Sequence, residues 1–509
     1  MNYVKFFNGK PTVFYAVDGW VFEKDVEAGF LGEAFSIHLA FPYMPLKGSN
    51  YLKRCEIKLK KRLILELLEN LVLDFPELSY VIHIKPEYFM YEALLSRARL
   101  FPPIYYDICS FLRREVQKQN LKKVMEGYND ALRELEREGI VKRVDLDLFK
   151  ISKEFIEESR KRKALFTNLL RSAQKALFNS LLGTFPKVLR VLSERVDAIL
   201  KFQFSENEWL KFRAEHTIKN PEAYLLVPTA NGLIPLSATI NIEDFANKIM
   251  KAGEKASVAT EKLGGVLNDV YLVKVFGNDE ERKVVVKSFK DWSSFKWFPL
   301  TLWTVGTRAF AVLGRSRLER ECSINQFLHS KGFAVPKLLS VSHSQKLVFL
   351  EYLEGETLDK VIKKIYSLGA EGEIQKELEI IRKVGEIIAK VHALNVALGD
   401  TKPENVLVGK NGEIFLMDFE QASRNGDKTW DVAEILYYLG HYAPPFTETR
   451  LIEIAAQAFI KGYLEAGGNL KTVKAAGKPK YTKVFSVFVF PHIILAISNI
   501  CQNAESIKG

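Results

Sequence analysis

Three side chains between residues 400 and 418 could act together on a phosphate group: Asp400, Asn405 and Asp418. Transfer of a γ-phosphoryl group needs one carboxylate to orient the attacking hydroxyl, and it needs an Asn and a second carboxylate to hold Mg²⁺ on the phosphates. Such a reaction takes little covalent help from the protein, so the placement of these groups decides the rate. Their types and spacing therefore predict a phosphotransfer site.

The surrounding sequence predicts the elements that position these groups. A helical stretch from residue 387 ends in a Gly-Asp turn at Asp400. Two apolar strands, 406–408 and 413–419, are joined by a Lys-Asn-Gly turn into a β-hairpin whose second strand ends on Asp418. The hairpin returns Asp418 to the edge at which the loop after the helix lies, and the apolar strands hold that loop rigid.

Two motifs in this stretch resemble those of the protein-kinase superfamily. Residues 399–405, GDTKPEN, resemble its catalytic loop, and residues 418–420, Asp-Phe-Glu, stand where the family has Asp-Phe-Gly. A Leu-Gly pair at 398–399 replaces the usual His-Arg, as in the Gly-Asp loops of RIO kinases, the small kinase of the KEOPS complex, and aminoglycoside or choline kinases. The resemblance covers residues 256–509 and implies a two-lobed kinase fold with ATP and Mg²⁺ in the cleft.

Glu420 and the segment after it depart from ordinary protein kinases. Gly tolerates backbone angles that are closed to other residues, so Glu420 is expected to remove the hinge that flips the metal-binding Asp of regulated kinases. The Asp-Phe-Glu-Gln-Ala sequence also resembles the Asp-x-x-Gln pattern of RIO kinases. The activation segment is short, and Asp431, which follows it, is expected to be a buried carboxylate that props the catalytic loop.

Lys287 lies in the apolar run VVVKSF, which predicts a buried strand. A bare ammonium there would cost several kcal/mol unless it were paired, so Lys287 needs anionic partners. In kinases these partners are the α- and β-phosphates and a Glu of the next helix. Glu321 is the expected partner, because it stands before the Gly332 turn as in RIO- and KEOPS-type kinases, and Glu319 is the second choice.

The resemblance also implies the nucleotide contacts. Gly264 and Gly265 would form the turn that covers the phosphates, and residues 268–271, Asn-Asp-Val-Tyr, resemble the Ser-Asp-Val-Tyr of RIO kinases. Backbone groups near Glu351 and Leu353 would read the adenine edge. The expected roles are Asp400 as base or hydroxyl-orienting carboxylate, Lys402 on the transferring phosphate, Asn405 and Asp418 on Mg²⁺ or Mn²⁺, Lys287 on the α- and β-phosphates, and Glu321 as the partner of Lys287.

The composition is that of an ordinary globular protein, with 47% hydrophobic and 27% charged residues among 509. The four cysteines are far apart and form no C-x-x-C, which fits a reducing cytoplasm and indicates neither a zinc site nor a disulfide framework. The N-terminus lacks the pattern of a signal peptide. The last apolar run, residues 484–501, is interrupted by Pro491 and is expected to be a buried helix pair; a membrane anchor is the alternative.

The whole chain predicts an α+β protein in which a small α/β domain and a basic helical segment precede the kinase-like fold. The α/β domain combines β-like runs at 12–22 and 80–91 with a helix at 61–75. A hairpin turning at Asn231-Gly232 and a linking helix follow the basic segment. The expected ranges are 1–110 for the small domain, 111–204 for the helical segment, 205–255 for the hairpin and linker, 256–354 for the N-lobe and 355–509 for the C-lobe.

The net charge of +11 is concentrated in one segment and favours an acidic partner. Residues 160–201 hold ten Lys/Arg against two acids. This segment is either the solvated face of a packed helix, a contact for nucleic-acid phosphates or a surface for anionic lipid. The long stretch 291–317 with three tryptophans either packs locally or forms a substrate or partner surface.

Three functions are open at this point. The first is an atypical protein kinase of archaeal type that phosphorylates Ser/Thr hydroxyls of itself or of a partner protein. The second is a small-molecule kinase of the aminoglycoside or choline type, although those enzymes usually carry acidic pockets and this chain is basic. The third is an ATPase or ATP-sensing module on an RNA-containing complex, which the basic helices at 160–201 favour.

Overall fold

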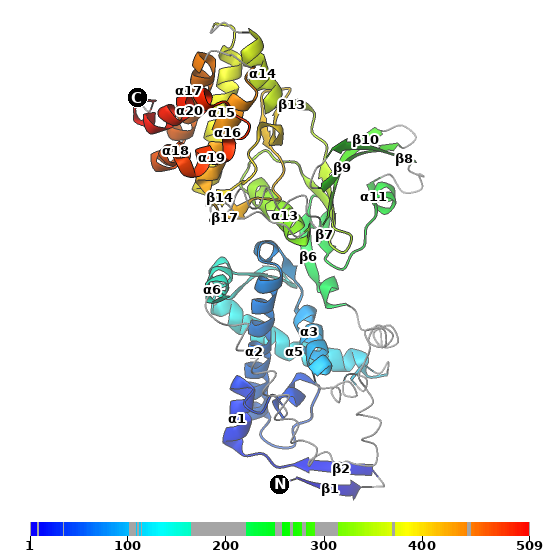
Figure 1. Cartoon of the computed structure of the whole chain (residues 1–509). Coiled ribbons are helices and arrows are strands. Elements are labelled where there is room, and N and C mark those ends of the chain that lie inside the picture. The colour runs from blue at the N-terminus through cyan, green and yellow to red at the C-terminus, as the bar shows by residue number, and fades with distance from the viewer. Residues whose placement is uncertain are drawn as a thin grey trace. The chain divides into compact units, whose positions relative to one another are not determined.

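The computed structural model describes residues 2–7, 10–33, 35–100, 108, 111–112, 115–163, 220–249, 257–264, 268–276, 281–290, 314–368, 372–444 and 449–507. The chain forms two compact units (Figure 1): Met1–Val227 with Pro235–Ser237, and Pro228–Ile234 with Ala238–Gly509. Gly265, most of the basic segment 160–201 and the tryptophan-rich residues 291–313 lie outside the described residues, so the predictions made for them stay untested.

The first unit combines helices with antiparallel strands in the order β4-β5-β3-β6, of which β6 belongs to this unit as far as Val227. The predicted helix at 61–75 is confirmed as part of a longer one, α2, which packs against α5 and α3. The elements are β1 (Asn2–Phe7), β2 (Lys10–Tyr15), α1 (Gly19–Ala28), α2 (Ser49–Asp74), β3 (His83–Ile84), α3 (Pro86–Leu100), α5 (Gln117–Arg137), β4 (Val141–Asp145), β5 (Leu148–Ile151), α6 (Lys153–Lys163) and the start of β6 (Leu225–Thr229). The rest of β6 and most of β7 (Gly232–Pro235) belong to the second unit.

Both strands predicted for this unit are partly wrong. In each case a residue that favours the start of a helix ends the strand early. The run 12–22 changes from strand to helix because the Asp18 side chain accepts hydrogen bonds from the backbone N–H groups of Trp20 and Val21, which caps α1. The run 80–91 is a strand only at β3, since Pro86 opens α3 with a fixed φ that suits the first helical position.

The segment 111–204 is not helical throughout, because residues 141–151 form the hairpin of β4 and β5. Gly139 ends α5 as predicted, with φ +75°. The Gly139 N–H donates to Glu136 O and the Ile140 N–H donates to Leu135 O, which is the bonding pattern of a Schellman motif. The chain therefore leaves the helix in a direction that starts a strand.

The interface between α2 and α5 contains a buried ion pair. Lys60 is fully buried and donates to Glu56 at 2.7 Å and to Val124 O at 2.8 Å. A Cβ atom on Gly127 of α5 would come within 2.1 Å of Glu56 Oε1. The absence of a side chain at Gly127 is what makes room for the pair.

The second unit contains a five-stranded antiparallel sheet of order β11-β12-β10-β9-β8. Its strands are β8 (Ser257–Gly264), β9 (Asn268–Phe276), β10 (Glu281–Phe289), β11 (Leu338–Ser342) and β12 (Leu347–Glu351). Helix α13 (Gly314–Ser330) packs against β10, β11 and β12. The predicted linking helix is α11 (Ile242–Ile249), and its Phe245 ring stacks on Phe349 with centroids 4.3 Å apart.

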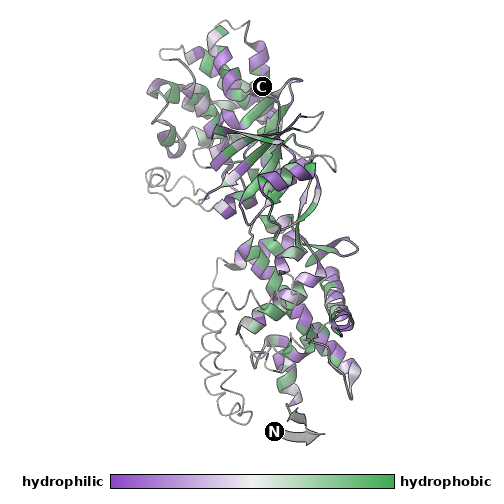
Figure 2. Ribbon diagram, turned by 90° about the vertical axis from the view of Figure 1, so that its right-hand side faces the viewer, coloured by the Kyte–Doolittle hydropathy of each residue, from purple (hydrophilic) through white to green (hydrophobic). Residues whose placement is uncertain are grey.

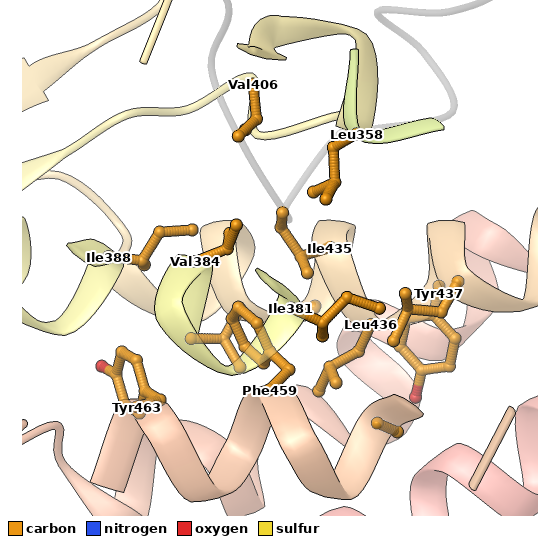
Figure 3. Close-up of a cluster of buried hydrophobic side chains, with 14 of the residues drawn as sticks. Leu358, Ile381, Val384, Ile388, Val406, Ile435, Leu436, Tyr437, Phe459 and Tyr463 are labelled. Atoms are coloured by element: carbon orange, nitrogen blue, oxygen red, sulfur yellow. The ribbon is translucent and has the colours of Figure 1, made fainter. Parts of the chain in front are cut away.

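The rest of the second unit is mainly helical and encloses its largest buried apolar cluster among the described residues. Side chains of α14, α15, α16, α17 and β15 face one another in this cluster (Figure 3). Hydrophobic and hydrophilic residues alternate along the helices, so each helix has a side to bury (Figure 2). The elements are β13 (Gly355–Thr357), α14 (Leu358–Leu368), α15 (Gln375–Ala393), β14 (Val396–Ala397), β15 (Val406–Gly409), β16 (Ile414–Leu416), β17 (Ser423–Arg424), α16 (Lys428–His441), α17 (Thr449–Glu465), α18 (Leu470–Ala476), α19 (Pro479–Phe485) and α20 (Pro491–Gln502).

Two glycines set the distance between α15 and α17. A Cβ atom on Gly462 would lie 1.9 Å from Arg382 O, and a Cβ atom on Gly385 would lie 2.2 Å from Phe459 O. Each glycine therefore faces the backbone of the opposite helix. The two helices approach more closely than any side chain at these positions would allow.

The predicted helix pair in the last apolar run is confirmed only in part: residues 491–501 lie in α20, but only residues 484–485 lie in α19, and residues 486–490 are not helical. The prediction that the pair is buried holds only in part, since Val487, Phe490 and Leu495 are exposed while Phe485, Ile493 and Ile497 are buried. Among the described residues, no helix has both the length and the apolar character needed to cross a membrane.

Candidate active site

Strand β10 and helix α13 bring Lys287 and Glu321 together. Lys287 Nζ lies 3.1 Å from Glu321 Oε1 and 3.2 Å from Asp418 Oδ1, and both Lys287 and Glu321 are buried. Glu319, the second choice from the sequence, pairs instead with Arg315 at 3.5 Å. The buried lysine thus has two carboxylate partners drawn from segments far apart in the chain.

The charges around Lys287 hold this group in its ionised form. Burial alone would lower the pKa of Lys287, but the nearby carboxylates of Asp418 and Glu321 outweigh it and raise that pKa. Burial would raise the pKa of Asp418, but the charges of Lys287 and Lys402 lower it overall. An ammonium and a carboxylate that both stay charged are what phosphate binding and metal binding require.

The loop after β14 carries the second group of residues. Lys402 Nζ lies 2.9 Å from Asp400 Oδ2, and Asn405 Nδ2 donates to the backbone O of Asp400 at 2.9 Å. Gly399, immediately before Asp400, has φ +76°, a conformation that glycine adopts without strain. The chain can therefore reverse just where the carboxylate must project.

One backbone hydrogen bond joins the two groups. The Met417 N–H donates to Asn405 O at 2.9 Å, directly before Asp418. The predicted hairpin is confirmed as β15 and β16, but its second strand ends at Leu416, and Asp418 follows with φ +64°. A non-glycine residue in this region is strained by about 1–3 kcal/mol, and such strain is common where a side chain is held for function.

Asp431 holds the backbone of the loop, as the sequence predicted. Its Oδ2 accepts from Leu398 N–H at 2.6 Å and its Oδ1 accepts from Gly399 N–H at 2.7 Å. His392 Nε2 lies 3.0 Å from the same carboxylate, and Tyr463 Oη lies 2.9 Å from His392 Nδ1. Asp431 is fully buried, so the loop is fixed from inside the helical part of the unit.

Three buried residues near the site contact one another in a way that the sequence did not indicate: Asn268, Arg317 and Glu420. Asn268 donates to the Glu420 carboxylate, and Arg317 Nη1 donates to Asn268 Oδ1 at 2.7 Å. Burial, and next the charge of Asp418, raise the pKa of Glu420 to about 7. Asn268 and Glu420 both stand in motifs that the sequence singled out, but neither motif indicates that the two side chains meet.

The positions expected to contact the nucleotide base and the phosphates lie on the sheet. Gly264 is the last residue of β8, and Glu351 is the last residue of β12. The Glu351 N–H already donates to Lys337 O at 2.9 Å, and its side chain pairs with Lys337 at 3.6 Å. Leu353, in contrast, is not on the sheet and lies between β12 and β13. The Glu321 carboxylate accepts from Phe419 N–H at 2.7 Å.

The donor set fits a divalent cation that binds together with phosphate. Because Asn405 Nδ2 donates to Asp400 O, its Oδ1 is directed away from that bond. No cluster of three or more His, Cys, Asp or Glu side chains able to hold a metal occurs in the described part of the chain. Mg²⁺ is usually held by one or two carboxylates with water and phosphate oxygens, so Asp418 and Asn405 suffice as protein ligands.

Comparisons with known proteins agree with this geometry. The model of the lipopolysaccharide kinase (Kdo/WaaP) family matches residues 274–463. The KEOPS complex subunit Bud32 of Pyrococcus abyssi is 26% identical over 159 residues, which are 31% of this chain and 68% of that protein. The probable serine/threonine-protein kinase BUD32 homolog of Archaeoglobus fulgidus is 24% identical over 160 residues, 31% of this chain and 72% of that protein.

The family model covers the stretch that contains Lys287, Glu321, the GDTKPEN loop and Asp418. Together with the two relatives, it confirms the resemblance drawn from those motifs. The C-terminal half of the chain is a kinase-like region of the protein-kinase-like superfamily, similar to the atypical RIO and Bud32 kinases.

Proposed function

We propose that the second unit is an ATP-dependent atypical protein kinase, which transfers the γ-phosphate to Ser/Thr hydroxyls of the chain itself or of a partner protein. The observation that carries the proposal is the convergence of Lys287, Glu321 and Asp418 beside the loop of Asp400, joined to it by the hydrogen bond from Met417 to Asn405. The name of the Archaeoglobus relative, a probable serine/threonine-protein kinase, supports a protein hydroxyl as acceptor. We also propose that residues 256–354 and 355–509 form the two lobes.

In this mechanism each residue has one task. Asp400 orients the attacking hydroxyl and accepts its proton, and Lys402, 2.9 Å from Asp400, presents its charge to the transferring phosphate. Lys287 binds the α- and β-phosphates and is kept in place by Glu321. Asn405 and Asp418 hold Mg²⁺ or Mn²⁺, which when bound neutralises charge on the β- and γ-phosphates.

The test is the transfer of labelled γ-phosphate from ATP with Mg²⁺ or Mn²⁺, in which protein label and free phosphate are scored separately. Asp400→Ala removes the hydroxyl-orienting group, so protein label is expected to fall by about 10²- to 10⁴-fold, in keeping with the loss of a catalytic acid or base. ATP binding should persist in this variant, because Lys287 keeps its partners Glu321 and Asp418. Protein label that is unchanged in Asp400→Ala would refute the assignment.

A non-protein acceptor is the second candidate, and the match to the lipopolysaccharide kinase family model favours it. A hydroxyl of a sugar or another small molecule would then replace Ser/Thr. The same assay separates this candidate when sugar and small-molecule fractions are added, because the label would move to that fraction and would still depend on Asp400.

The basic segment supports a partner of opposite charge. Residues 160–201 carry ten Lys/Arg and two acids, and the Pyrococcus relative is named as a subunit of a complex. An ATPase on an RNA-containing complex would release free phosphate, lost in Asp400→Ala, with no protein label. An ATP sensor would bind ATP and give neither signal. Such a module should bind RNA with an affinity that falls steeply between about 50 and 200 mM salt.

A further inference from the structure

Glu420 directly follows the Asp418-Phe419 pair, and its carboxylate is buried between two other elements of the second unit. Asn268, the first residue of β9, donates through Nδ2 to Glu420 Oε2. Arg317 of α13 donates through Nη1 to Asn268 Oδ1 at 2.7 Å and lies 3.5 Å from both oxygens of Glu420. Three separate stretches of the chain thus meet at one carboxylate.

The residue types in this triad match the roles that its geometry gives them. An Asn side chain both donates and accepts, so it can stand between a carboxylate and a guanidinium, which only accept and only donate. Arg317 is fully buried, and its Nη2 donates to the backbone O of Lys290. A buried guanidinium is costly without a polar partner, and the Glu420 carboxyl group is the acid that lies 3.5 Å from it.

The triad lies beside the groups of the proposed reaction. Arg317 and Glu321 are four residues apart on α13 and therefore share a face of the helix. Glu321 contacts Lys287 and accepts from Phe419 N–H, while Arg317 contacts Glu420. Helix α13 consequently holds the segment 418–420 at two successive residues, and Asn268 adds the start of β9.

We infer that Glu420 is a positioning residue that acts through Asn268 and Arg317 to hold Asp418 beside Lys287, and that it joins β9 and α13 to the metal-binding segment before any nucleotide is bound. This inference rests on the proposed phosphotransfer function. With glycine at position 420, Arg317 and Asn268 would lose their shared carboxyl group. Of the two contacts described above between segment 418–420 and α13, that of Phe419 with Glu321 would remain. Asp418 would then lie beside Lys287 for only part of the time. MgATP would bind only to that fraction of the molecules, so its apparent affinity would fall.

A charge exchange tests the inference in the full-length protein. Asn268→Asp sets a second carboxylate against Glu420, and Glu420→Gln removes the anion that Arg317 needs. In the double variant the Gln amide can donate to the new carboxylate, which also pairs with Arg317, so the net charge of the triad is restored. We expect each single variant to raise the KM for MgATP by about tenfold, and we expect the double variant to return to within about threefold of the parent.

Tyr366→Phe is the matched control. It removes the partly buried hydrogen bond from Tyr366 to Leu439 O, so it should lower the Tm without raising the KM for MgATP. If Tyr366→Phe raised the KM as much as Glu420→Gln at an equal loss of Tm, or if the double variant were no better than the worse single variant, a positioning role for Glu420 would be overturned.

Hydrogen exchange of the nucleotide-free protein separates this inference from the proposed function. The Phe419 N–H should exchange at least about tenfold faster in Glu420→Gln than in the parent and recover in the double variant, whether or not the protein transfers phosphate. Absence of ATP binding and turnover in the parent would refute the proposed function. Equal exchange in all variants would refute the positioning role of Glu420.

Discussion

Asp431 Oδ1 accepts a hydrogen bond from the Gly399 N–H at 2.7 Å, which places a fully buried carboxylate directly behind the residue that precedes Asp400. In Asp431→Asn an amide nitrogen must face either Gly399 N–H or Leu398 N–H, so one donor is left opposite another donor. We expect the second unit to lose about 2–4 kcal/mol of unfolding free energy.

The same substitution should lower kcat more than it raises the KM for ATP, because the loop moves while Lys287 and its partners stay in place. Denaturant unfolding and steady-state kinetics of Asp431→Asn measure the two effects. A variant with parental kcat would mean that the loop keeps its position without this carboxylate.

Lys60 and Glu56 give a prediction for the first unit. Lys60→Met leaves Glu56 buried with fewer partners and should destabilise the unit by about 3–5 kcal/mol. The double variant Lys60→Met with Glu56→Gln removes both charges and should recover most of that loss, since apolar or neutral replacements of buried pairs are often tolerated. Thermal unfolding of the three proteins tests this, and equal Tm values for the single and double variants would contradict it.

The pH dependence of the first unit should depend on His83, which is buried in β3. Burial and then the charge of Lys150 lower the pKa of His83 from 6.5 to about 4. Between these values the unfolded chain binds a proton that the folded chain does not, so stability is present above pH 6.5 and is lost as the pH falls toward 4.

The slope from this one group is at most about 1.4 kcal/mol per pH unit. His83→Gln removes the proton uptake on unfolding. As the pH is lowered from 7 to 5, the Tm of the parent should therefore fall more than the Tm of the variant. A constant difference across this range would show that His83 is not the titrating group.

The motif residues could be predicted from the sequence because each motif fixes several groups on one short stretch. Asp400, Lys402 and Asn405 lie within one loop. The apolar run around Lys287 predicted a buried strand, and a lysine in such a strand needs an anionic partner. Glu321 was expected from the resemblance to RIO- and KEOPS-type kinases, and the structure brings Glu321, rather than Glu319, to Lys287.

Other features depended on contacts that no short stretch of sequence contains. Asn268 and Glu420 are 152 positions apart. Each lies in a motif that the sequence singled out, but neither motif indicates which side chain its residue contacts. The strands at 141–151 were missed because β4 is an edge strand with residues 142–145 exposed, so its charged sequence lacked the apolar alternation of a half-buried strand. Asp18 and Pro86 ended the predicted strands early through capping chemistry that outweighed the apolar pattern.

The close crossing of α15 and α17 limits how this sequence can diverge. Gly385 and Gly462 each meet the backbone of the opposite helix, so replacement by any other residue requires both helices to move apart at once. Helix α15 leads within a few residues into the loop of Asp400, so a shift of α15 would be passed on to that loop. Genetic variation at these two glycines should therefore be as strongly selected against as variation at the reacting groups, although neither glycine carries an atom that could take part in the chemistry.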